Sequence, residues 1–178
     1  MADKVRATRT DTKQRLLGKN CLVYLNYGEG ATEDAPKWTA IGGQTKGNLE
    51  MSADSIDGSN KDSGGWGEEY AGTKSTELSL EGYATKADGA YEALKDAFVK
   101  GEAVDICRFF SDAGTADRNW YHITKLSDET PHDDMVSFSM TLGGIGAPKF
   151  YKGLSTVDGV KGDLTVSQTG SQTAGGKA

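Results

Sequence analysis

The residues that could carry out chemistry in this sequence are few, and their spacing forms no recognisable site. His122 and His132 are the two histidines, and neither lies in the HxxxH or HExxH spacing that brings zinc ligands together on a helix. No GxSxG segment, which exposes a nucleophilic serine in many hydrolases, occurs in the chain. The sequence therefore predicts no catalytic residue, no metal site and no cofactor, and we expect a protein that is not an enzyme.

Clustered carboxylates are the remaining candidates for chemistry. One acidic run contains Asp54, Asp57, Asn60 and Asp62. These side chains offer oxygen ligands for Ca²⁺, but they lack the spacing and the final glutamate of an EF-hand loop, so we interpret them as a solvated loop. Two pairs, at 68–69 and 133–134, are adjacent in sequence and face opposite ways in extended chain, which does not suit a glycosidase.

Charge is unevenly distributed along the 178 residues, whose net charge is −6. Residues 1–20 carry +4 and residues 149–178 carry +2, which leaves −12 for the segment between them. An acidic body does not favour tight nucleic-acid binding, because phosphates need a basic surface. The basic ends could instead bind the acidic body of another copy, or they could be solvated tails.

Cysteine content and hydropathy exclude further classes. Cys21 and Cys107 are the only cysteines, which excludes a disulfide scaffold and a four-cysteine zinc site. The chain has no run of about 18 apolar residues, so we expect no membrane-spanning segment. Its polar, charged start does not resemble a secretory signal.

Apolar periodicity predicts a mainly β protein. Short β-rich or alternating segments occur at 21–27, 37–41, 44–52, 73–84, 103–110, 118–126 and 135–142. Leu78 and Leu80 alternate with Glu77, Ser79 and Glu81, which predicts a half-buried strand with an acidic outer face. We therefore expect a β-sandwich or partly closed barrel of about seven strands.

One flanking α-helix is predicted at 87–100. Asp88 can cap its N-terminus and Gly101 can end it. Tyr91, Leu94 and Phe98 recur at helical spacing and form an apolar stripe for packing against the sheet.

Three segments are predicted to lie outside this framework. They are an extended N-terminal arm at 1–18, a long glycine-rich loop at 53–72 and a flexible C-terminal segment at 151–178. The β domain then spans 19–150. A structureless loop of this length inside a compact domain is usually functional or disordered. Trp66 within it could dock onto a partner, or could pack back onto its own core.

The order of these segments resembles the major tail, or tail tube, proteins of long-tailed bacteriophages. The resemblance is carried by GKNCLVYLNYG at 18–28, WTAIGGQTKGNLEMSADSID at 38–57, KDSGGWGEEYAGTKSTELSLEGY at 61–83, ADGAYEALKDAFVKG at 87–101 and the AVDICRF strand that follows. It covers roughly residues 18–146, and its most specific part is the KDS–WGE–KS run that leads into an alternating strand and then the helix.

This resemblance implies a structural subunit of a virion tail. Such subunits self-assemble into six-membered rings that stack into a hollow tube, and genome DNA passes through the lumen without specific binding. Expected partners are other copies of the chain, a tail initiator or baseplate, a tape measure protein and a tail terminator. Assembly would take place in the host cytoplasm, where both cysteines would stay reduced. Similar subunits occur in tail-like bacteriocins and secretion tubes.

The resemblance also assigns roles by position. Inter-ring contacts would fall on the loop at 53–72, and the arm at 2–17 would bind the next ring. The residues concerned are Asp57, Lys61, Asp62 and Trp66 in the loop, and Arg6, Arg9 and Arg15 in the arm. Glu77, Ser79 and Glu81 are expected to line the lumen, where an acidic face would repel DNA phosphates; an ordinary solvated outer face is the alternative.

A second hypothesis assigns the protein to a different functional class, that of binding modules. Trp38, Trp66 and Trp120 could form an aromatic platform on a monomeric β-sandwich module that binds a carbohydrate or a receptor. Such a module would stay monomeric at any concentration, whereas a tube subunit would form rings or polymers.

Overall fold

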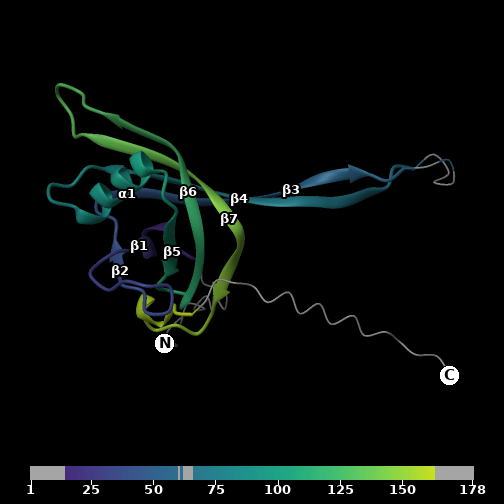
Figure 1. The fold of residues 1–178 in the computed structure, drawn as a ribbon, viewed down its shortest axis with the longest axis horizontal. Helices are drawn as coiled ribbons and strands as arrows, with labels where there is room; N and C mark the ends of the chain where they lie inside the picture. Colours follow the sequence, from purple (N-terminus) through teal and green to yellow (C-terminus); the bar gives the residue numbers. More distant parts are fainter. Residues whose placement is uncertain (1–14, 60, 62–65, 163–178) are drawn as a thin grey trace, which may run out of the picture.

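The computed structural model describes residues 15–59, 61 and 66–162, which form one curved antiparallel sheet with a helix packed against it (Figure 1). The sheet has seven strands in the order β2-β1-β5-β6-β7-β4-β3. The strands are β1 (Cys21–Asn26), β2 (Trp38–Ala40), β3 (Gln44–Asp57), β4 (Glu69–Tyr83), β5 (Val104–Phe110), β6 (Thr115–Glu129) and β7 (Ser137–Tyr151), and the helix is α1 (Gly89–Lys100). The predicted mainly β class with one helix is confirmed.

The sheet bends around the core without closing into a complete barrel. Where β1 approaches β3, the side chain of Gln44 takes the place of a strand partner. Its Oε1 accepts from the Val23 N–H at 2.7 Å, and its Nε2 donates to the Val23 carbonyl at 3.1 Å. Arg108 on β5 donates to the Gly47 carbonyl on β3 at 3.0 Å. Side chains therefore span the gap that a backbone ladder would otherwise close.

The helix forms where predicted, with one difference in its buried face. The Asp88 carboxylate accepts from the N–H groups of Ala90 and Tyr91, and Gly101 ends the helix with φ 69°. Tyr91 and Leu94 are buried against the sheet. Phe98 is 43% exposed, because the buried face of the helix continues from Leu94 to Ala97 and leaves Phe98 at its margin.

The segment at 53–72 is not one long loop, which corrects the prediction. β3 and β4 remain paired as far as Asp57↔Glu69, and together they project from the body as a long hairpin (Figure 1). Only 58–68, between the two strands, lacks strand structure among the described residues. The outer part of the hairpin buries neither face, so it shows no apolar alternation; backbone hydrogen bonds hold it, and they require no side-chain pattern.

The segment at 151–178 also differs from the prediction in its first part. β7 continues to Tyr151, and residues 152–162 cover a second, smaller core on the far side of β1 and β5. Val160 is fully buried there, and its carbonyl accepts from Trp38 Nε1 at 3.0 Å. Apolar residues spaced at 154, 157 and 160 therefore anchor this part of the chain; residues 163–178 lie outside the described structure.

Candidate assembly surfaces

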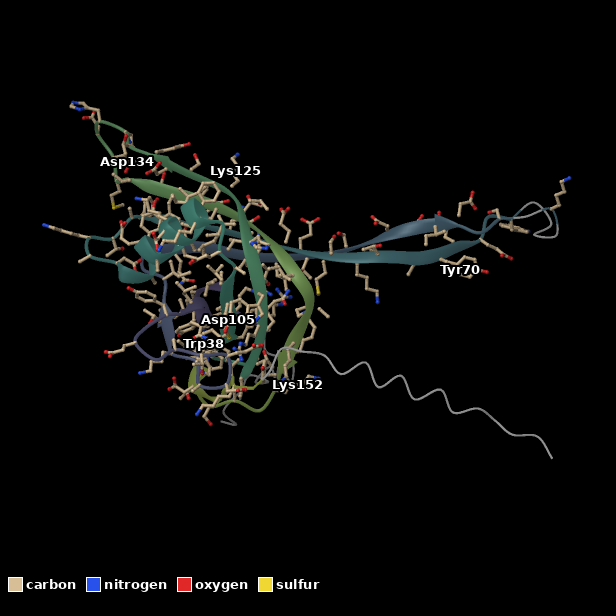
Figure 2. The ribbon with its side chains drawn as sticks, viewed as in Figure 1. Trp38, Tyr70, Asp105, Lys125, Asp134 and Lys152 are labelled. Carbon is tan, nitrogen blue, oxygen red and sulfur yellow. The ribbon has the colours of Figure 1, made fainter. Side chains whose placement is uncertain are left out.

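The far end of the β3–β4 hairpin carries the predicted loop residues. Asp57, Lys61 and Trp66 lie there and are exposed, whereas Asp62 lies outside the described residues. Trp66 is 83% exposed, so the alternative in which it packs back onto its own core is wrong. Figure 2 shows Tyr70 on the same projecting hairpin, far from Trp38 and Asp105 in the body.

Local hydrogen bonds extend the hairpin beyond its last strand pair. The Gly58 N–H donates to the Glu68 carbonyl at 2.9 Å. The Asp57 carboxylate accepts from the Ser59 N–H at 2.8 Å, and hydrogen bonding to the Ser59 hydroxyl and to this N–H lowers the pKa of Asp57. The described end of the hairpin is thus held by its own backbone and presents charged and aromatic side chains outward.

The N-terminal arm contributes only its last residues to the described structure. Arg15 is exposed, and so are Leu16 and Leu17, immediately before a short 3₁₀ turn at Gly18–Asn20. Arg6 and Arg9 lie outside the described residues. Two adjacent exposed leucines beside a basic residue form a surface that can bind another protein.

Glu77, Ser79 and Glu81 point away from the core, while the intervening Leu78 and Leu80 are fully buried. Their cross-strand partners on the same face are Lys46, Asn48 and Glu50 on β3 and Ser139, Thr141 and Gly143 on β7. The face is therefore polar over three neighbouring strands. Lys46 Nζ lies 2.6 Å from Glu81 Oε1, so the lysine offsets part of the acidic charge.

A buried ion pair that the sequence analysis missed connects three parts of the body. Arg118 on β6 is fully buried, and its Nε and Nη2 atoms donate to the two carboxylate oxygens of Asp105 at 2.9 and 2.6 Å. The same guanidinium donates to the carbonyls of Glu33 and Gly162 and lies 5.2 Å from the centre of the Trp38 ring. It therefore ties the 28–37 loop and the C-terminal segment to the sheet.

A second ion pair lies on the opposite face of the same two strands. Arg108 and Asp117 are cross-strand partners, with two hydrogen bonds of 3.0 and 2.7 Å between them. Charged residues interrupt the otherwise apolar run of β5, and an Asp-Arg pair precedes the aromatic residues of β6. That pattern is the signal that could have indicated paired charges inside the fold.

The two cysteines lie on opposite faces of the sheet. Cys21 pairs with Phe110, and Cys107 pairs with Tyr24, so the side chains of the two cysteines point apart and both thiols are free. Burial raises the pKa of the Cys107 thiol, which keeps it protonated and unreactive at neutral pH.

The other residues that the sequence offered as candidates for binding or metal coordination do not lie together in one site. Trp38 packs in the smaller core, Trp66 is at the hairpin end, and Trp120 is partly buried near Glu33, so the tryptophans share no platform. Within residues 15–59, 61 and 66–162, no group of three histidine, cysteine or acidic side chains could hold a metal ion. No helix in this part of the chain is long and apolar enough to cross a membrane.

Solved structures with a similar fold come from tails and from a contractile injection system. A subunit from the tail of an empty gene transfer agent particle, refined with C6 symmetry, matches with TM-score 0.66 and 25% identity over 77% of this chain and 99% of the other. The SPP1 tail tube matches with TM-score 0.66 and 12% identity over 79% and 81%. A chain from the sheath–tube complex of an extracellular contractile injection system matches with TM-score 0.55 and 13% identity over 79% and 94%. The fold is therefore one that solved tail structures share.

A model of the phage tail tube protein family matches residues 16–150. The chain therefore belongs to the phage tail tube protein family, and it is a structural component of a virion tail and not an enzyme. No curated protein sequence matches the chain.

Proposed function

We propose that this subunit assembles into six-membered rings that stack head to tail into a hollow conduit for genome DNA. The observation that carries the proposal is the long β3–β4 hairpin, which leaves the body with both faces of its outer part exposed among the described residues. The C6 symmetry of the gene transfer agent tail supports the number of subunits in the ring.

Unpaired strand edges provide a way to close the ring. Among the described strands, β3 pairs only with β4, so no strand of the described structure covers its outer edge. β6 pairs with β5 only as far as Tyr121, which frees the same edge of β6 over 122–129. A free edge binds another strand readily. Joining the β3 edge of one copy to this β6 edge of the next would continue the sheet around a ring and pair both of these edges.

Stacking would use the surfaces that lie outside the sheet. The hairpin end and the basic arm would contact different surfaces on the next ring. Such a heterologous contact does not close on itself, so the stacking of rings continues into a tube. The basic arm would reduce the repulsion between acidic bodies. A tail initiator or baseplate, a tape measure protein and a tail terminator are the further partners that a tube of defined length requires.

The polar face of β3, β4, β6 and β7 is our candidate for the lumen. Its charged residues are Lys46, Glu50, Glu77, Glu81, Lys125 and Glu129. Acidic residues outnumber basic ones there, and the other side chains are mostly small and hydroxylated, so DNA phosphates would find few groups to bind.

Reversing two of these charges should impair DNA passage without preventing assembly. We expect tubes of Glu77→Lys/Glu81→Lys to form but to retain DNA, lowering DNA delivery at low salt by about ten-fold or more, because added lysines bind phosphates. Glu92→Lys/Asp96→Lys makes the same change of charge on exposed α1 and should deliver normally. Normal low-salt delivery by the β4 variant would remove support for this face as the lumen.

Removing the N-terminal arm should separate folding from assembly. Deletion of residues 2–17 is expected to leave a folded monomer, because the described arm residues are exposed, and to raise the concentration needed for tube growth by about ten-fold or more. Circular dichroism and negative-stain electron microscopy measure the two effects. Replacing Arg6, Arg9 and Arg15 with glutamine keeps the arm length and isolates the role of charge. Normal tubes from the deletion would refute the role of the arm.

Electron microscopy of the purified protein across a concentration series, with and without a tail-initiation complex, tests the proposal as a whole. Hollow tubes of stacked rings are the expected result. A strictly monomeric particle under both conditions would contradict it and would favour the binding-module hypothesis.

A further inference from the structure

An open apolar groove lies at the base of the hairpin, where β4 and β7 separate. The two strands are paired as far as Glu77↔Gly143, and beyond this point β4 continues into the hairpin while β7 turns away (Figure 1). A Cβ on Gly144 would lie 1.8 Å from Thr76 Oγ1, so glycine is needed for this close approach. The groove beyond has a volume of about 680 Å³.

The walls of this base groove are apolar and uncovered. They are formed by Met51 and Ala53 on β3 and by Ala147, Pro148 and Phe150 on β7. Met51 is 59% exposed and Phe150 is 58% exposed, and within the described structure the base groove is flanked by the edges of β4 and β7 that are unpaired beyond Glu77↔Gly143. Among the described residues that line it, Lys74 is the one that carries a charge. Apolar side chains beside unpaired strand edges suit an apolar segment of another protein.

The far end of the hairpin has the complementary chemistry. Ile56, Trp66 and Tyr70 are exposed there, on a support held by the backbone ladder and the Gly58–Glu68 hydrogen bond. The charged residues described in this region are Asp54, Asp57, Lys61, Glu68 and Glu69, a net charge of −3. An acidic, aromatic hairpin end therefore matches an apolar groove whose one charged group is a lysine.

A chain cannot place its hairpin end in its own base groove. The two-stranded ladder runs outward from Met51↔Thr76 to Asp57↔Glu69, and six residues at about 3.3 Å each separate the groove from the hairpin end by roughly 20 Å. A hairpin end that occupies the groove must therefore belong to a second copy. Because the two surfaces differ, each added copy leaves a new groove and a new hairpin end, and the contact repeats.

We propose that the hairpin end of one subunit docks into the base groove of a neighbouring subunit, with Trp66 against Phe150 and Met51. The inference rests on the proposed tube assembly and identifies the surface that receives the hairpin. It makes Lys74 the electrostatic partner of the acidic hairpin end.

Photo-crosslinking in assembled tubes tests the docking directly. With Trp66 replaced by p-benzoylphenylalanine, irradiation should yield crosslinks between copies at residues 51–53 or 144–150. The same replacement at Val99, which is also 83% exposed but lies at the end of α1, should yield none there. Crosslinks from position 66 to the N-terminal arm or to the 130–136 turn, in normal tubes, would overturn the docking proposal and leave tube assembly intact.

Charge reversal gives an independent readout. Lys74→Glu should raise the concentration needed for tube growth by about ten-fold, because it places an acidic group against the acidic hairpin end. Combining it with Asp57→Lys should recover most of the loss, whereas the matched exposed change Lys86→Glu should have no effect. Equal effects of Lys74→Glu and Lys86→Glu, or no recovery in the double variant, would contradict the pairing. Absence of tubes from the parent chain itself, even with an initiator, would instead contradict the proposed function.

Discussion

Replacing Arg118 with methionine should lower the free energy of unfolding by about 3–5 kcal/mol. Methionine fills a similar length but leaves Asp105 as a buried carboxylate without its cation. The change also removes the donors that bind the Glu33 and Gly162 carbonyls, so the 28–37 loop and the C-terminal segment lose a shared anchor. Urea unfolding of the monomer, followed by tryptophan fluorescence, measures the effect.

Two further variants distinguish the contribution of the ion pair to stability from that of the surrounding apolar contacts. Arg118→Met/Asp105→Leu removes both charges and should recover much of the loss, since an apolar pair can replace a buried ion pair. Recovery should be incomplete, because Asn26 also donates to Asp105, at 2.8 Å. Arg118→Lys keeps the charge but cannot make the bidentate contact. If Arg118→Met unfolds at the same urea concentration as the parent protein, apolar contacts alone hold the 28–37 loop and the C-terminal segment.

The elements predicted from sequence are those with one buried face. In β4, Leu78 and Leu80 alternate with polar residues, and burial on one side imposes that period. The helix was predictable because Asp88 and Gly101 mark its ends by local backbone chemistry. Burial of one face and helix capping each leave a pattern within a short stretch of sequence. These elements can therefore be predicted without knowing which distant residues they contact.

The features that were missed depend on residues far apart in the chain. The outer hairpin is a strand pair without a buried face, so nothing in its composition distinguishes it from a loop. Arg118 is buried because Asp105 lies on the neighbouring strand and because residues 28–37 and 152–162 cover it. The base groove similarly joins residues about a hundred positions apart. Only the register of the sheet brings these groups together.

Excising the outer hairpin should abolish tube growth and leave the monomer folded. Ala53 and Lys74 are cross-strand partners, so replacing residues 54–73 with Asn-Gly closes the shortened hairpin with a favoured two-residue turn. None of the excised residues belongs to either core, so the free energy of unfolding should change by less than about 1 kcal/mol. Urea unfolding and sedimentation measure the two effects. An unfolded monomer, or tubes of normal length, would contradict the separation of hairpin and core.

The excised chain also makes a stringent test when mixed with the parent chain. It keeps the residues that line the base groove, because Met51–Ala53, Lys74–Thr76 and 144–150 are unchanged, but it has no hairpin end to offer. A subunit with one of two heterologous surfaces can join a growing tube and cannot extend it. We therefore expect small molar fractions of the excised chain to shorten parent tubes. Adding Ala147→Glu, which obstructs the groove and repels the acidic hairpin end, should remove this inhibition; if the inhibition persists, the excised chain blocks growth through another surface.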